Sequence, residues 1–357
     1  MQLDQPKDIR KGEGLNEEAL ALYLDQIYGK EKGNLYVKQF PSGFSNLTYL
    51  INYNGVDYVL RRPPFGANIK SGHDMSREFK ILTALNGNYP KAPKPITFCE
   101  DLNVLDTPFY IMERVNGVIL RASTPSNQMP SEKEFSILSD KLVDTLVELH
   151  QLDYKQIGLG DFGRPEGYTS RQVEGWSARY LKAKTTTNKE MEKTASWLQA
   201  NIPKSSNASL IHNDFKYDNL VLTGDAHLDI KAVLDWEMTT IGDPLMDLGT
   251  TLGYWIHHTD PEFLAQNQLN ITPRKGNPTR GELVEMYEKK SGKTVDDIVF
   301  YFVFGVFKIA VIVQQIYYRY CQGHTSDPRF KELDKIVSLY GLVAQQAIQK
   351  KKIDHLF

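Results

Sequence analysis

The sequence predicts an α+β protein with a small antiparallel sheet followed by a larger, mainly helical region. Three observations support this fold class. Between residues 35 and 115, short apolar runs typical of strands alternate with turn residues and surround one helical segment. After Gly117 amphipathic helical periodicity dominates, and one short hairpin at residues 220–236 interrupts it. A chain of 357 residues can bury two cores. We therefore expect an N-terminal domain over residues 1–115 and a C-terminal domain over residues 116–357.

The N-terminal elements begin with a helix. Apolar residues at helical spacing, with acidic residues in the first turn, predict an amphipathic helix over residues 16–28. Three strand-like runs follow, LYVKQF, LTYLINY and DYVLRR, and the turn signal Asn54-Gly55 joins the last two. Helical periodicity returns over residues 73–85, and the runs ITFCE and PFYIMERV then predict two more strands. The expected order after the first helix is β-β-β-α-β-β.

The C-terminal elements are helices apart from the hairpin. The clearest amphipathic pattern covers residues 132–152, and a charged helical stretch covers residues 170–201. Residues 299–313 approach the hydropathy of a membrane span but contain Lys308. Because a charge inside a membrane span costs about 2.5 kcal/mol or more, we expect a buried helix.

Polar residues form a stripe along this apolar helix. Tyr301, Lys308 and Gln315 recur every seven residues, and Arg319 lies four residues further on. One interpretation places the stripe at the surface, where the cations reach solvent along apolar stems. The other turns it toward a bound substrate, so that Lys308 and Arg319 attract an anionic group.

Composition points to a small-molecule partner. The 42 Lys and Arg against 44 Asp and Glu give a net charge of −2, so we expect binding to neither nucleic acid nor a membrane. Cys99 and Cys321 stand far apart, which argues against a disulfide framework or a zinc site and favours the cytoplasm. The charged first residues predict no signal peptide. The sequence does not indicate an oligomeric state.

Two polar segments contain the candidate catalytic and metal-binding residues. Residues 210–222 read LIHNDFKYDNLVL, and residues 232–249 read AVLDWEMTTIGDPLMDLG. They resemble the HxDxxxxN catalytic loop and the metal-binding Asp of the aminoglycoside phosphotransferase-like kinases, distant relatives of the protein kinases. The resemblance covers roughly residues 30–340 and is greatest to the subgroup also found joined to acyl-CoA dehydrogenases. It implies a protein-kinase-like fold of two lobes: an N-terminal lobe that covers a nucleotide, with one key helix, and a C-terminal lobe with the catalytic loop, metal site and acceptor-binding helices.

The resemblance also assigns roles in transfer of a phosphoryl group from ATP. Asp214 would accept or orient the proton of the attacking hydroxyl, while Asn219 and Asp235 would bind Mg²⁺. The hairpin between them would return the chain so that these oxygen ligands converge. Asp161, in a second metal-like sequence Asp-Phe-Gly, precedes the loop and is therefore expected to be an ordinary loop residue. The HxDxxxxN match alone could be a polar turn between two buried strands. Because the hairpin and Asp235 follow it, the whole segment predicts a kinase.

The residues expected to bind the nucleotide are predicted from weaker sequence signals. Gly43, Ser45 and Asn46 lie in a turn whose amides would cover phosphates by resemblance, although a plain β-turn explains them as well. Arg61 stands where the family commonly has a Lys that contacts phosphates, and Glu78 would be its ion-pair partner. Arg is wider and forked, so this phosphate contact is in doubt. The alternative is that both residues are solvated surface charges.

The strand that ends near Glu113 and Val115 would supply backbone groups to the adenine edge, again by resemblance. Three other polar residues are expected to be structural. His212 would brace the loop, and Asp243 and Asp247 would cap backbone amides rather than bind metal.

The leading hypothesis is a Mg²⁺- and ATP-dependent kinase acting on a small-molecule hydroxyl. The alternatives are a nucleotide-binding pseudokinase and a true aminoglycoside kinase. Aminoglycosides are polycations that need an acidic pocket, whereas residues 251–357 contain fourteen Lys and Arg against eleven Asp and Glu. This charge favours a neutral or anionic acceptor, such as a sugar, a hydroxy acid or a hydroxyacyl-CoA.

Overall fold

The computed structural model describes residues 5–29, 32–41, 46–65, 74–204, 207–224, 228–266, 270–325 and 327–357. The chain forms two compact units. The first contains Met1–Ile119 and Leu220–Thr239, and the second contains Leu120–Asn219 and Thr240–Phe357. The first boundary lies close to the expected one at residue 115. The hairpin that we assigned to the C-terminal domain groups instead with the first unit.

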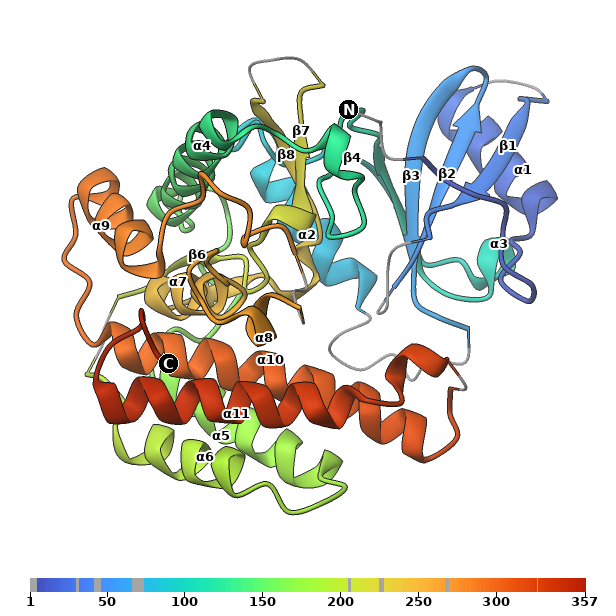
Figure 1. The fold of residues 1–357 in the computed structure, drawn as a ribbon. Helices are drawn as coiled ribbons and strands as arrows, with labels where there is room; N and C mark the ends of the chain where they lie inside the picture. The colour runs from blue at the N-terminus through green and yellow to red at the C-terminus, as the bar shows by residue number, and fades with distance from the viewer. Residues whose placement is uncertain are drawn as a thin grey trace. The chain divides into compact units, whose positions relative to one another are not determined.

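An antiparallel sheet with the order β1-β2-β3-β5-β4 forms the centre of the first unit (Figure 1). Its strands are β1 (Leu35–Gln39), β2 (Leu47–Tyr53), β3 (Val56–Arg62), β4 (Pro95–Cys99) and β5 (Phe109–Glu113). Asn54 has φ 52° and Gly55 has φ 83°, the left-handed backbone that a tight turn between β2 and β3 requires. All five predicted strands are confirmed.

Three α-helices, a hairpin and a short 3-10 helix complete the described part of the first unit. They are α1 (Glu17–Tyr28), α2 (Met75–Leu85), α3 (Leu102–Leu105), β7 (Leu220–Leu222), β8 (Ile230–Val233) and the 3-10 turn η3 (Trp236–Met238). Helix α1 lies beside α3 and β1, and α2 packs on β4 and β5 (Figure 1). Tyr49, Leu60 and Ile111 are completely buried in the core. The hairpin joins the unit through a bridge between Val118 and Leu222, and η3 contacts α2.

The second unit is mainly helical. Its longer helices are α4 (Glu132–Gln151), α5 (Tyr168–Ala183), α6 (Lys189–Ala200), α7 (Pro244–Gly253), α9 (Arg280–Ser291), α10 (Ile298–Cys321) and α11 (Leu333–Lys350). Its short elements are η1 (Ser126–Gln128), β6 (Ser209–Ile211), η2 (Tyr217–Asn219), β9 (Thr240–Gly242), α8 (Glu262–Ala265) and η4 (Pro328–Phe330), with β6 antiparallel to β9. The charged helical stretch predicted over residues 170–201 consists of two helices, α5 and α6.

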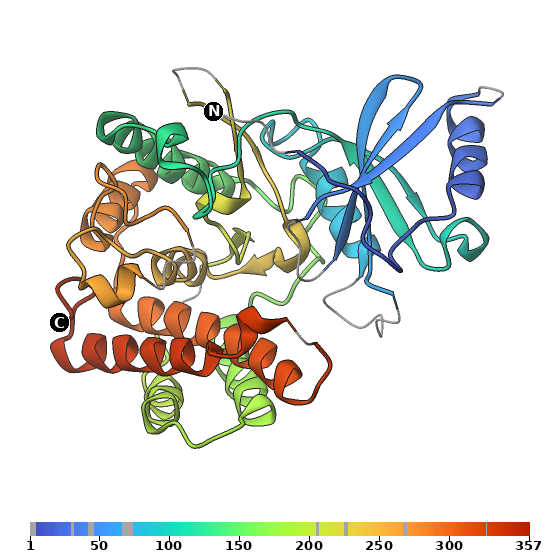
Figure 2. The ribbon, with the colours of Figure 1, turned by 45° about the vertical axis from the view of Figure 1, so that its right-hand side comes forward.

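Helix α10 is the centre of the second unit, where it packs against α5, α6, α7 and α11. Figure 2 shows α10 and α11 side by side, in orange and red, with the yellow-green α5 and α6 along them. The α7 and α10 backbones approach so closely that a Cβ on Gly305 would overlap the carbonyl oxygen of Gly249. Within the described residues, α10 is the one helix long and apolar enough to cross a membrane, but most of its apolar window is buried. A buried helix is what the sequence predicted.

Candidate active site

The loop after β6 holds the predicted catalytic residue. The Asp214 carboxylate accepts hydrogen bonds from the Lys216 ammonium at 2.7 and 2.9 Å, one to each oxygen. The side-chain amide of Asn219, five residues on, donates to the same carboxylate at 3.0 Å and to the Asp214 carbonyl at 2.8 Å. The structure therefore brings Asp214 and Asn219 together and adds Lys216, which sequence reasoning overlooked although it lies inside the motif.

The charge environment keeps Asp214 ionised. Burial acts to raise the pKa of Asp214, but the charge and hydrogen bonds of Lys216, with His212 and Lys308 further away, hold that pKa below its usual range. His212 is completely buried, and its Nδ1 accepts the Asp214 amide at 3.3 Å. The prediction that His212 braces the loop is confirmed.

Helix α7 fixes the backbone of this loop. One oxygen of Asp247 accepts the His212 amide at 2.6 Å, and the other accepts the Asn213 amide at 2.7 Å. His150 of α4 lies 3.2 Å from the same carboxylate. Asp243 begins α7 as its N-cap and accepts the Leu245 amide at 3.0 Å. Asp243 and Asp247 thus bind backbone amides, as predicted.

The first unit holds a cluster of charged side chains around the buried Arg61. One guanidinium nitrogen donates to Glu78 of α2 at 2.8 Å, and the other to Asp235 at 3.0 Å and Glu237 at 3.2 Å. Arg61 and Glu78 are 7% and 2% exposed, so the alternative of solvated surface charges is wrong. Burial alone would lower the pKa of Arg61, but Glu78, Tyr110 and the neighbouring carboxylates raise it well above its usual value.

Asn219 and Asp235, considered separately, each have an oxygen atom of a kind that Mg²⁺ binds. The amide group of Asn219 donates to Asp214, which leaves the Oδ1 oxygen of Asn219 for a cation. The Asp235 carboxylate gives one oxygen to Arg61, and its side chain is 36% exposed. Amide and carboxylate oxygens are ligands that Mg²⁺ accepts. Each residue is thus chemically suited to the metal role that the sequence predicted.

The remaining nucleotide-side predictions are only partly described. Gly43 and Ser45 lie outside the described residues. The side chain of Asn46 is buried and donates to Glu237 at 2.8 Å. The Glu113 amide donates to the Lys94 carbonyl at 2.9 Å, so this N–H is already used within the first unit. Val115 packs against the small cluster around Val221. Adenine binding by Glu113 and Val115 stays a prediction.

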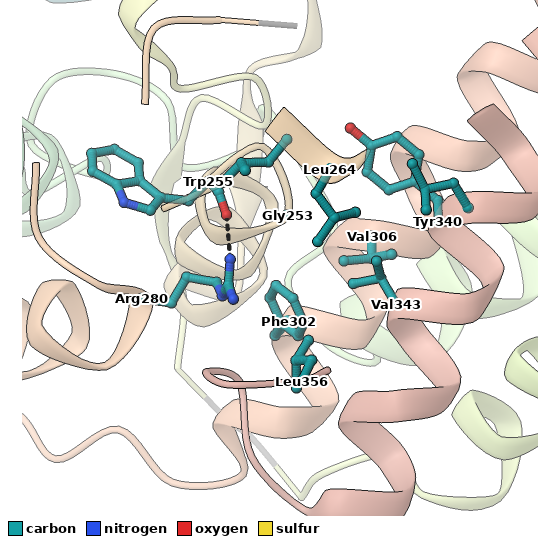
Figure 3. Close-up of a pocket in the computed structure, with 11 residues that line it drawn as sticks. Gly253, Trp255, Leu264, Arg280, Phe302, Val306, Tyr340, Val343 and Leu356 are labelled. Carbon is teal, nitrogen blue, oxygen red and sulfur yellow. Dashed lines mark hydrogen bonds between the residues drawn. The ribbon is translucent and has the colours of Figure 1, made fainter. Parts of the chain in front are cut away.

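The second unit also contains a small, mainly apolar pocket of about 30 Å³. Figure 3 shows Phe302 and Val306 of α10 near Tyr340 and Val343 of α11. The charge at its wall, Arg280, is neutralised by Asp260 through bonds of 2.7 and 2.9 Å and donates to the Trp255 carbonyl (Figure 3).

An aromatic residue next to two pocket-lining residues in the chain contacts the loop of Asp214. The Lys216 ammonium is 4.6 Å from the ring centre of Tyr254. In the chain, Tyr254 stands between Gly253 and Trp255, which line the pocket. Tyr254 thus connects the backbone beside the pocket with the loop of Asp214. Sequence periodicity carries no signal for such a pocket, because its walls come from helices far apart in the chain.

The polar stripe on α10 does not face one common surface. Tyr301 is buried and donates to Asp243 at 2.8 Å, while the Lys308 ammonium donates to the Asn213 carbonyl at 2.5 Å. Arg319, by contrast, is exposed. Neither interpretation of the stripe as a whole is correct, because its first two members bind buried groups of the same unit.

Comparisons with known proteins identify the family of this chain. The model of the phosphotransferase enzyme family matches residues 37–271. Acyl-CoA dehydrogenase family member 11 of Homo sapiens is 35% identical over 321 residues, which are 87% of this chain and 40% of that protein. The chain spans less than half the length of the curated relatives it matches.

Solved structures share the fold. A Ralstonia eutropha structure, provisionally described as an aminoglycoside phosphotransferase, has a TM-score of 0.77 at 30% identity and covers 94% of this chain and 99% of its own. A GDP complex of aminoglycoside 2'-phosphotransferase-IIIa has a TM-score of 0.60 at 12% identity and covers 91% of this chain and 98% of its own, which shows the fold alone. The predicted family resemblance and kinase-like α+β fold are confirmed.

Proposed function

This chain belongs to the phosphotransferase enzyme family, and we propose that it is a small-molecule phosphotransferase that transfers the γ-phosphate of ATP to a hydroxyl group. The observation that carries the proposal is the Asp214 carboxylate, held by Lys216 and Asn219. The acceptor oxygen forms a bond to the γ-phosphorus. The bond between that phosphorus and the bridging oxygen breaks and releases ADP, and the hydroxyl proton passes to Asp214.

Asp214 acts mainly by orienting the hydroxyl. A carboxylate whose pKa lies below its usual range is a weak base early in the reaction. It accepts a strong hydrogen bond, however, and so directs the acceptor oxygen toward phosphorus. Lys216 holds both carboxylate oxygens and thereby limits the orientations that the acceptor hydroxyl can take.

Asn219 and Asp235 would hold Mg²⁺. When bound, the metal neutralises charge on the phosphates of the nucleotide. Arg61, fixed by Glu78, would contact the phosphates as a cation. The proposal leaves the phosphate-covering turn at Gly43, Ser45 and Asn46 as an expectation. The free thiols Cys99 and Cys321 are consistent with a cytoplasmic enzyme.

The acceptor is proposed to carry an apolar part. The pocket beside Tyr254 is lined mainly by apolar side chains, and its one cation is paired with Asp260. A polycationic aminoglycoside would find few unpaired carboxylates in such a surface, whereas the hydrocarbon part of a hydroxy acid or hydroxyacyl-CoA would be desolvated favourably. These two classes are therefore favoured over sugars and aminoglycosides.

The nucleotide part is tested by thermal unfolding. ATP with Mg²⁺ at one hundred times its Kd should stabilise the protein by about 2.7 kcal/mol. Asp214→Asn should keep this stabilisation while kcat falls by about 10²- to 10⁴-fold. Asp161→Asn, a change at an exposed loop carboxylate, is the matched control and should leave both unchanged. No stabilisation with any divalent cation would contradict the proposal, whereas binding without turnover would favour a pseudokinase.

The acceptor part is tested by turnover of labelled ATP. The panel would contain hydroxy acids of increasing chain length, their CoA thioesters, simple sugars and an aminoglycoside. Val306→Phe, which fills the pocket, should raise the KM of the preferred acceptor without changing that of ATP. Val313→Phe on the same helix, outside the pocket lining, is the control. Preferred turnover of the aminoglycoside would refute the assignment of acceptor class.

A further inference from the structure

Lys308 is a charged residue in an apolar helix, and its place there needs an explanation. Its side chain is 2% exposed, and nearly all its neighbours along α10 are apolar and buried. Burial lowers the pKa of Lys308 to about 8, with the charges of Asp214 and Asp247 opposing that shift. Desolvation of an ammonium is costly, whereas a methionine would pack with no such penalty. A lysine at this position therefore suggests a role besides packing.

The ammonium of Lys308 holds the residue that precedes Asp214. It donates to the Asn213 carbonyl at 2.5 Å and lies 5.8 Å from the ring centre of Trp176. The Asn213 carbonyl belongs to the same peptide group as the Asp214 amide. Because a peptide group is planar, fixing its oxygen also fixes the direction in which the chain enters Asp214.

Asn213 needs this support, because its φ of 67° lies in the left-handed region. Three helices hold it. Asp247 of α7 accepts its amide at 2.7 Å, Tyr168 of α5 binds its side chain at 3.1 Å, and Lys308 of α10 binds its carbonyl. Each polar group of Asn213 thus has a partner on a different helix. The unusual backbone persists because its surroundings determine it completely.

We propose that Lys308 is a positioning residue for phosphoryl transfer, which holds the Asn213–Asp214 peptide group so that the Asp214 carboxylate points at the acceptor hydroxyl. The inference rests on the proposed function, since it takes Asp214 as the group that meets the acceptor. Lys308 does not touch the acceptor, because it is buried and donates to the main chain. The charged groups around it are Asp214, Asp247, Lys216 and Arg179.

The test compares two buried donors on α10. Lys308→Met removes the ammonium and keeps the length of the side chain. Gln314→Leu is the matched control, because Gln314 is also buried and also donates to a main-chain carbonyl, that of Ala183 at 2.9 Å. With ATP, Mg²⁺ and the best acceptor of the panel, we expect Lys308→Met to lower kcat by about 100-fold, since small misplacements have effects of this size. Both KM values should stay within about twofold, as expected when only transition-state interactions are lost. Gln314→Leu should have wild-type kcat per folded molecule.

A double mutant separates positioning through Asn213 from other effects. Tyr168→Phe removes a second support of Asn213. If both side chains act through Asn213, the factor by which kcat falls in the double mutant should be smaller than the product of the factors in the two single mutants. A product of independent effects would overturn the inference, as would an unchanged kcat in Lys308→Met or a rise in the acceptor KM alone. If Lys308→Met does not fold, Lys308→Gln, which keeps a shorter donor, is expected to show the same loss. Full activity in Asp214→Asn would instead refute the proposed function, and this inference with it.

Discussion

Asp247 is expected to contribute more to stability than any exposed carboxylate of the second unit. Its two oxygens accept the amides of His212 and Asn213, and it is completely buried. Asp247→Ala would leave both amides without their acceptor. An unsatisfied buried donor costs about 1–3 kcal/mol, so the two amides together amount to roughly 2–6 kcal/mol. Asp247→Asn keeps one acceptor oxygen and should lose about half as much.

This magnitude can be measured by urea unfolding, followed by a probe of the second unit and by differential scanning calorimetry. The matched control is Asp144→Ala, which removes an exposed partner of Lys290 at 2.7 Å. Such a surface pair is worth about 0–1 kcal/mol. A loss below about 1 kcal/mol in Asp247→Ala would refute the reasoning, because it would mean that water or another group satisfies the two amides.

Three further predictions concern stability. Gly305→Ala should cost about 1–3 kcal/mol through overpacking against α7, while Gly14→Ala, with open space around it, should cost nothing; equal Tm values would contradict this. Arg61→Met should destabilise the first unit by about 3–5 kcal/mol at neutral pH, because it leaves Glu78 buried and charged. This loss of stability should become smaller as pH falls, because burial raises the pKa of Glu78 and its carboxyl can then take up a proton. A loss that does not depend on pH would exclude the buried charge of Glu78 as its cause. Burial acts to raise the pKa of Asp247, but its hydrogen bonds hold that pKa below the unfolded value. The contribution of Asp247 to stability should therefore be lost as pH falls below about 4. In that range the free energy of unfolding should fall more steeply with pH in the wild type than in Asp247→Asn, and parallel curves of the two proteins would refute this prediction.

The sequence predicts the first unit better than the second for a physical reason. Strands of five to seven residues, such as β2 and β3, are rich in β-branched and aromatic residues and are joined by a turn signal, so the local sequence defines them. Strands β6 and β9 are three residues long, too short for a period. Helix α7 is buried nearly all round and shows no polar face that periodicity could detect.

The candidate site can be predicted from the sequence where its residues belong to one short motif. The family resemblance implied that Asp214 and Asn219 act together and that Arg61 pairs with Glu78, and the structure brings the members of each pair together. The contacts of Arg61 with Asp235 and Glu237 depend on the hairpin β7–β8 joining the first unit, which no local signal indicates. The role of Lys308 was unpredictable for the same reason, since its partner lies 95 residues away.

The presence of Arg rather than Lys at position 61 has a consequence for the carboxylate of Asp235, the proposed metal ligand. The two guanidinium nitrogens divide their bonds, one to Glu78 and the other to Asp235 and Glu237. A single ammonium would have to reach all three acids from one point, whereas the planar fork spans them with separate donors. Arg61 thereby neutralises part of the charge of Asp235 while no metal is bound. A divalent cation that takes Asp235 as ligand must compete with this bond, so Arg61→Lys should bind Mg²⁺ at lower concentration. Metal titration followed by the Tm of the first unit would show this, and an unchanged midpoint would mean that Arg61 and the metal use different oxygens of Asp235.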